Sequence, residues 1–186
     1  MFKHYKETGI YVNDSEENFQ ALATIKDLFL RDPIRDSVMV NFCVRTTLHL
    51  YLTVRKFEKD SEIIFTGFNI PDMVQIVHEH GLKTVPLDLN LETLAPTSIE
   101  DFKKLITPKT KVFLVAFIHG IRYDIKPYAE VCKEHGIELI EDVAQSFSGT
   151  RLWVGSPEAK LTMFSFGTIK TQTCFGGAVS IVHNDK

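Results

Sequence analysis

From residue 61 onward, short continuous apolar runs alternate with longer segments in which apolar residues recur every three or four positions. The continuous runs predict buried strands over 61–67, 83–89, 111–118 and 137–142. The periodic segments between them predict helices over 71–81, 97–106 and 126–136. This alternation is typical of βαβ units. The sequence therefore predicts a three-layer α/β fold, with a mainly parallel sheet and helices on both faces.

Residues at the ends of these helices support the assignment. Pro71 stands where a helix begins, and Gly81 and Gly136 stand where helices end. Thr97 precedes Glu100 by three residues, which is the spacing of a capping box.

The N-terminal part of the chain lies outside this alternation. Amphipathic helices are predicted over 16–31 and 45–56. We expect an N-terminal helical segment over 1–40 and one large domain over 41–186, a length sufficient for a sizeable core.

Charge and composition exclude several classes of partner. The formal net charge is −3 and the pI about 6.2, so no basic surface for nucleic acid or acidic lipid is indicated. The apolar run at 112–118 is too short to span a bilayer. We expect neither a nucleic acid nor a membrane partner.

Three cysteines, without a C-x-x-C pair, argue against a disulfide framework and for a reducing compartment. The N-terminal residues contain no apolar segment of the kind found in a secretion signal. The sequence predicts a cytoplasmic protein.

In parallel sheets, ligands bind beyond the carboxyl ends of the strands. Residues that follow predicted strands are therefore site candidates: Phe68, Asn69, Asp88, His119, Gly120, Asp142 and the segment 165–170.

Asp142 and Lys170 are the most informative of these residues. Asp142 ends an apolar predicted strand, so we expect it at the edge of the sheet. A buried carboxylate there needs a cation or hydrogen-bond donors. The simpler alternative is that Asp142 is a helix cap or a turn residue. Lys170 stands among apolar residues, and an uncharged amine in such surroundings suits Schiff-base chemistry. A solvated surface charge is the alternative for Lys170.

Other ligand motifs are missing from the sequence. His78 and His80 stand two residues apart on a predicted helix and point to different faces, and no Cys/His set has zinc spacing. Neither a G-x-G-x-x-G after a strand nor a P-loop occurs. We expect no metal and no dinucleotide.

An ordered set of motifs carries a family resemblance. E-D-V-A-Q at 141–145 is followed by S-F at 165–166, by Lys170 and by G-G at 176–177. In order and spacing, the segment 137–185 resembles the core of the DegT/DnrJ-type (StrS-like) pyridoxal-phosphate-dependent sugar aminotransferases, which have the type I aminotransferase fold.

The resemblance implies a role for each of these residues. Lys170 would form the Schiff base with pyridoxal 5'-phosphate and move the substrate proton. Asp142 would keep the pyridine nitrogen protonated, so that the ring accepts electrons. Gln145 would contact the ring hydroxyl, and Ser165 would donate to the phosphate.

The family also places the phosphate at a helix N-terminus that begins with G-[ST]-x-A-L. Here Val44 replaces the glycine, and Arg45 and Thr46 fall at the phosphate-contacting positions. The simpler alternative is that the threonines only cap a helix. Phe68 is the candidate aromatic residue to stack on the cofactor ring, with a place in the core as the alternative.

The implied activity is transfer of an amino group from an amino acid, with glutamate favoured, to a keto group of a nucleotide sugar. The resemblance also implies a homodimer, and a small C-terminal domain that this sequence lacks. Two alternatives stay open: a truncated domain that binds the cofactor without turnover, and a different pyridoxal-phosphate reaction such as elimination or sulfur removal.

Overall fold

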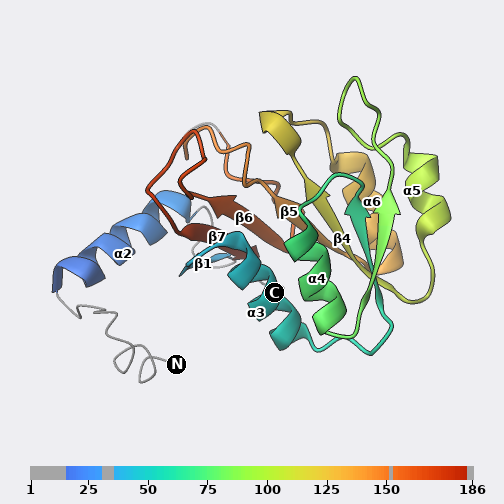
Figure 1. The fold of residues 1–186 in the computed structure, drawn as a ribbon, viewed down its shortest axis with the longest axis horizontal. Helices are drawn as coiled ribbons and strands as arrows, with labels where there is room; N and C mark the ends of the chain where they lie inside the picture. The colour runs from blue at the N-terminus through green and yellow to red at the C-terminus, as the bar shows by residue number, and fades with distance from the viewer. Residues whose placement is uncertain (1–15, 31–35, 151–152, 184–186) are drawn as a thin grey trace.

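The computed structural model describes residues 16–30, 36–150 and 153–183 (Figure 1). Its centre is a seven-stranded sheet of order β1-β7-β6-β5-β4-β2-β3. The strands are β1 (Asp36–Asn41), β2 (Glu62–Thr66), β3 (Lys83–Leu87), β4 (Thr110–Ala116), β5 (Glu138–Asp142), β6 (Leu161–Ser165) and β7 (Ala178–His183). The helices are α2 (Glu16–Phe29), α3 (Val44–Arg55), α4 (Pro71–Glu79), α5 (Ile99–Leu105), α6 (Lys126–His135) and the short 3₁₀ turn η1 (Ile118–Gly120).

The five strands β2 to β6 pair in parallel, and β7 runs antiparallel to both β6 and β1. Strands that follow one another in the chain from β2 to β5 are joined through the helices α4, α5 and α6, as the strand and helix periodicities predict. The predicted α/β fold with a mainly parallel sheet is confirmed.

Two apolar cores lie on opposite faces of the sheet. One contains Phe102 of α5 and Tyr128 of α6, packed on Phe113 of β4. The other contains Leu48 of α3 and Met73 of α4. Helices therefore cover both faces, and the strands between them are buried on both sides, which explains their continuous apolar sequences.

The helix ends follow the sequence signals with one correction. Pro71 begins α4, and Gly136 ends α6 in the left-handed conformation with φ of 66°. The capping-box prediction on Thr97 was wrong by one residue. Ser98 is the N-cap of α5, and its hydroxyl accepts a 3.0 Å hydrogen bond from the Asp101 amide.

The N-terminal segment contributes to the sheet as well as a helix. Strand β1 begins at Asp36, before the boundary at 40/41 that the sequence suggested. Helix α2 extends from the body (Figure 1) and buries only Phe29, whose ring lies 5.2 Å from that of Phe164 and 5.6 Å from that of Phe147. Residues 1–15 of the predicted segment, and residue 31 of the predicted helix, lie outside the described residues.

Several strands meet at one edge of the sheet. Asp142 at the end of β5 pairs with Ala116 at the end of β4. Ser165 at the end of β6 lies opposite Ala178 of β7, and Ala178 lies opposite Asn41 at the end of β1. This carboxyl edge is where an α/β sheet binds ligands.

Candidate active site

Asp142 is a nearly buried carboxylate at this edge, with 9% of its surface exposed. Its Oδ1 accepts a 3.0 Å hydrogen bond from the Ala144 amide. Burial raises the pKa of Asp142, and the hydrogen bond from Ala144 and the charge of Lys170 act against that rise.

Lys170 lines a cavity of about 360 Å³ at the same edge. The lining side chains come from the segments that follow β4, β5 and β6, and include His119, Gln145, Phe147, Ser165, Ile169 and Lys170. The structure therefore brings together three residues that the sequence selected separately, namely Gln145, Ser165 and Lys170.

Gln145 is oriented by a contact that the sequence did not predict. Its Oε1 accepts a 2.8 Å hydrogen bond from the backbone amide of His119. His119 has a left-handed conformation with φ of 55°, which is uncommon outside glycine. Because Oε1 is engaged, the amide NH₂ of Gln145 remains as the donor to a ligand in the cavity.

The loop that carries Lys170 is tied to the end of β6. The Lys170 amide donates to the Gly167 carbonyl at 3.0 Å, and the Phe166 carbonyl accepts from the amides of Cys174 and Gly176 at 3.0 and 3.1 Å. These bonds close a compact turn between β6 and β7. The loop thus holds the lysine at the edge of the sheet.

The expected apolar surroundings of Lys170 were partly wrong. Ile169 and Phe175 expose 90% and 85% of their surfaces, whereas Phe164 is fully buried in the core. Ile169 and Phe175 are therefore largely exposed to solvent and do not enclose the lysine.

Buried hydrogen bonds between polar side chains hold the start of α3 against the sheet. Thr47 Oγ1 lies 3.0 Å from Ser180 Oγ of β7 and accepts a 2.9 Å hydrogen bond from Asn41 Nδ2 of β1. Val44 is buried in the core on this face, and the N-cap residue Cys43 makes no side-chain capping bond. Burial acts to raise the pKa of the Cys43 thiol, but the Thr46 hydroxyl and the amides of Thr46 and Arg45 at the start of α3 lower it.

Arg45 and Thr46 line a separate groove of about 400 Å³ between α3 and α4. Arg45 Nε lies 3.4 Å from Asp72 Oδ2, and Thr46 Oγ1 lies 3.4 Å from Cys43 Sγ. The structure does not bring these two side chains into the cavity that Lys170 lines.

Phe68 lies beside the cavity without lining it. It exposes 61% of its surface, and its ring centre is 6.4 Å from that of His119, which does line the cavity. The core alternative for Phe68 was therefore wrong.

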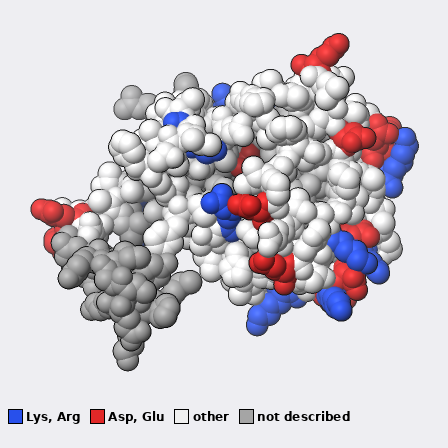
Figure 2. Space-filling model, viewed as in Figure 1, with Lys and Arg blue, Asp and Glu red and all other residues white. Residues whose placement is uncertain are grey.

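The surface in Figure 2 carries acidic and basic side chains next to one another, and they form no broad area of one sign on that face. Among the described residues, no helix combines the length and apolar character needed to cross a membrane.

Comparison with known proteins places the chain in a family. Residues 34–186 match the DegT/DnrJ/EryC1/StrS aminotransferase family, so the chain belongs to it. GDP-perosamine synthase of Vibrio cholerae is 30% identical over 129 residues, which are 69% of this chain and 33% of that protein.

Solved structures show the same fold. The aminotransferase TlmJ from Streptoalloteichus hindustanus matches with a TM-score of 0.77 and 18% identity, over 98% of this chain and 49% of that one. The protein Spr1654 from Streptococcus pneumoniae, in its PLP form, matches with a TM-score of 0.73 and 19% identity, over 90% and 45%. This chain spans from about a third to half the length of these relatives.

Proposed function

We propose that this chain is the cofactor-binding part of a pyridoxal-phosphate-dependent aminotransferase. In this proposal it moves an amino group from an amino acid, with glutamate favoured, to a keto group of a nucleotide sugar. The observation that carries the proposal is that Gln145, Ser165 and Lys170 line one cavity at the sheet edge where the buried Asp142 ends β5. Family membership and the name of the Vibrio cholerae relative support the substrate class.

The residues at the edge fit pyridoxal phosphate by their chemistry. A carboxylate whose pKa burial raises is stabilised by a cation, which a protonated pyridine nitrogen supplies. The Gln145 amide suits the ring hydroxyl, and the Ser165 hydroxyl suits a phosphate oxygen. When bound, the cofactor supplies an aldehyde that accepts the amino group and a ring that withdraws electrons.

Each residue then has one task. With the cofactor bound, the Lys170 amine would hold its aldehyde group and, as a free amine, would move the proton of the substrate carbon. Asp142 would hold the ring nitrogen in its protonated form. Gln145, fixed by His119, sets the orientation of the ring.

The start of α3 is the proposed phosphate site. Its first amides favour an anion, and Arg45 and Thr46 add a charge and a hydroxyl. Arg45 forms an ion pair with Asp72, and both side chains are about half exposed. An exposed ion pair contributes little to stability. We therefore propose that Arg45 leaves Asp72 when phosphate binds.

A homodimer and an acceptor pocket completed by sequence beyond this chain belong to the same proposal. They rest on family membership and on the partial coverage of the relatives.

The test is a single half-reaction. The purified chain is loaded with pyridoxal phosphate, glutamate is added, and the released cofactor is separated chromatographically. Formation of pyridoxamine phosphate and 2-oxoglutarate, lost in Lys170→Ala, supports the proposal. Tight cofactor binding without conversion would contradict the proposed activity and favour a domain that only binds the cofactor.

A further inference from the structure

Four phenylalanine rings join helix α2 to the two segments that line the candidate active site. They are Phe29 of α2, Phe147 after β5, Phe164 of β6 and Phe166 directly after β6. Where these rings contact one another, their centres lie between 5.1 and 6.2 Å apart. Separations of this size are typical of favourable aromatic contacts. We call this group the phenylalanine cluster.

Phe147 connects the phenylalanine cluster to the cavity that Lys170 lines. Phe147 lines the same cavity and follows Gln145 by two residues. Its ring stacks on that of Phe29 at 5.6 Å, with 21° between the ring planes. Phe29 does not line the cavity itself, so it supports this wall through the Phe147 ring.

Phe166 connects the cluster to the loop that carries Lys170. Its ring meets those of Phe147 and Phe29 edge-on, at 5.1 and 6.2 Å. Its backbone carbonyl accepts the hydrogen bonds from the amides of Cys174 and Gly176 that close the loop. Because the ring and the carbonyl belong to one residue, a shift of the ring is transmitted to the loop.

Phe29 is the member of the cluster that belongs to neither segment. It is the only buried residue of α2, with 5% of its surface exposed, and its ring contacts both Phe147 and Phe166. Since protein interiors are closely packed, a smaller side chain here leaves space into which these two rings can move. Such a movement would change the spacing between Gln145 on one segment and Lys170 on the other.

We propose that Phe29 is a positioning residue for the cofactor site. By packing against Phe147 and Phe166, it holds the segment with Gln145 at a fixed distance from the loop with Lys170. The consequence for cofactor affinity rests on the proposed function, whereas the packing can be tested without cofactor.

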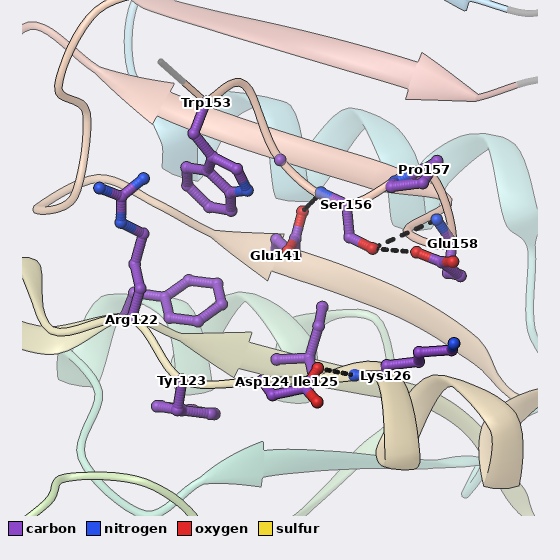
Figure 3. Close-up of a pocket in the computed structure, with 12 residues that line it drawn as sticks. Arg122, Tyr123, Asp124, Ile125, Lys126, Glu141, Trp153, Ser156, Pro157 and Glu158 are labelled. Atoms are coloured by element: carbon purple, nitrogen blue, oxygen red, sulfur yellow. Dashed lines mark hydrogen bonds between the residues drawn. The ribbon is translucent and has the colours of Figure 1, made fainter.

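A neighbouring loop provides an internal reference for such a test. Residues 153–158 are held to β5 by Glu141, whose Oε2 accepts a 2.7 Å hydrogen bond from the Ser156 amide (Figure 3) and a 2.9 Å bond from Thr162 Oγ1. Gly155 permits this close approach, since a Cβ built there would lie 2.5 Å from Thr162 Oγ1. The Ser156 amide therefore reports the attachment of this loop to β5 and not the phenylalanine cluster.

Phe102 of α5 provides a matched control. It is buried in the same apolar core as Phe29, and its ring packs on Phe113 and Tyr128. None of these three residues lines the cavity that Lys170 lines. Phe102→Leu should therefore lower the stability of the fold, as Phe29→Leu does, without moving the cofactor site.

The first experiment measures amide hydrogen exchange in the cofactor-free chain by NMR. We expect Phe29→Leu to speed exchange of the Cys174 and Gly176 amides about threefold to tenfold and to leave the Ser156 amide at the parent rate. In Phe102→Leu, the two loop amides should exchange no faster relative to Ser156 than in the parent chain. Parent-like exchange of the loop amides in Phe29→Leu, or an equal rise at Ser156, would overturn the proposal.

The second experiment titrates the same three proteins with pyridoxal phosphate by absorbance, at a temperature at which all are folded. Phe29→Leu is expected to bind about threefold to tenfold more weakly than the parent chain, and Phe102→Leu to bind like the parent. Parent-like affinity of Phe29→Leu overturns the proposal and leaves the proposed function standing. No binding by the parent chain would instead contradict the proposed function, and with it this role of Phe29, whatever the exchange rates.

Discussion

Asp142 at the end of β5 and Lys170 in the loop after β6 lie at the same carboxyl edge of the sheet. Burial raises the pKa of the Asp142 carboxyl, and the charge of Lys170 acts against that rise. The carboxylate is therefore destabilising to the chain alone and becomes favourable when a cation is bound beside it.

Replacing Asp142 with asparagine should separate these two effects. At pH 7 we expect Asp142→Asn to stabilise the cofactor-free chain by roughly 1–3 kcal/mol, because a desolvated charge is removed. Thermal unfolding would show this as a rise in Tm of about 2–4 °C for each kcal/mol. The same variant should bind pyridoxal phosphate more weakly.

The effect of Asp142→Asn on stability should depend on pH. The folded pKa of Asp142 is raised, so the carboxyl destabilises the fold as the pH rises above its unfolded pKa of about 4 and through the folded pKa. The Tm advantage of Asp142→Asn should therefore disappear below about pH 4. Asp88→Asn, at an exposed carboxylate, is the control; an equal advantage there would contradict the explanation.

Gln145→Glu tests the donor role of the side-chain amide. A carboxylate still accepts the hydrogen bond from the His119 amide, but it cannot donate to the cofactor hydroxyl. We expect an unchanged Tm and an affinity for pyridoxal phosphate about tenfold lower by absorbance titration. Unchanged affinity would remove Gln145 from the site.

Arg45→Ala tests the phosphate site at the start of α3. Loss of the guanidinium should weaken binding of pyridoxal phosphate by about tenfold or more and leave binding of pyridoxal, which lacks the phosphate, unchanged. Arg55→Ala is the matched control, because Arg55 pairs with Glu138 at the other end of the helix. Equal losses for both ligands would show that Arg45 acts on the fold instead.

Gly155→Ala tests the close approach of the loop to Glu141. The new methyl group would meet Thr162 and Glu141 at a φ of +96°. Gly149→Ala is the control, since Gly149 has a φ of +107° but nothing within 4 Å of a built Cβ. Chemical unfolding should show a loss for Gly155→Ala that exceeds the control by about 1–3 kcal/mol, the typical cost of overpacking. Equal losses of unfolding free energy in the two variants would show that the cost comes from the positive φ of the backbone and not from contacts of the new methyl group.

Elements with strong local signals could be predicted from the sequence. The apolar runs that became β2, β4 and β5 are buried on both faces, and their composition alone marks them. Strand β1 was missed because its alternating burial depends on pairing with β7, which lies at the far end of the chain. The residues of β1 alone do not indicate that a distant strand pairs with them.

Some features of the candidate site could likewise be predicted from the sequence, and others could not. Gln145, Ser165 and Lys170, which the family resemblance selected, share one cavity. The bond between Gln145 and the His119 backbone and the pairing of Arg45 with Asp72 join distant segments, so only coordinates reveal them. The exposure of Ile169 likewise depends on the path of the loop and not on its composition.

The most direct measurement identifies the lysine that holds the cofactor. The chain is incubated with pyridoxal phosphate, reduced with borohydride and digested, and the modified peptide is identified by mass spectrometry. Modification confined to Lys170, and its reduction in Asp142→Asn, is the result expected here. Modification spread over exposed lysines such as Lys104, with Lys170 left unmodified, would contradict the proposed site.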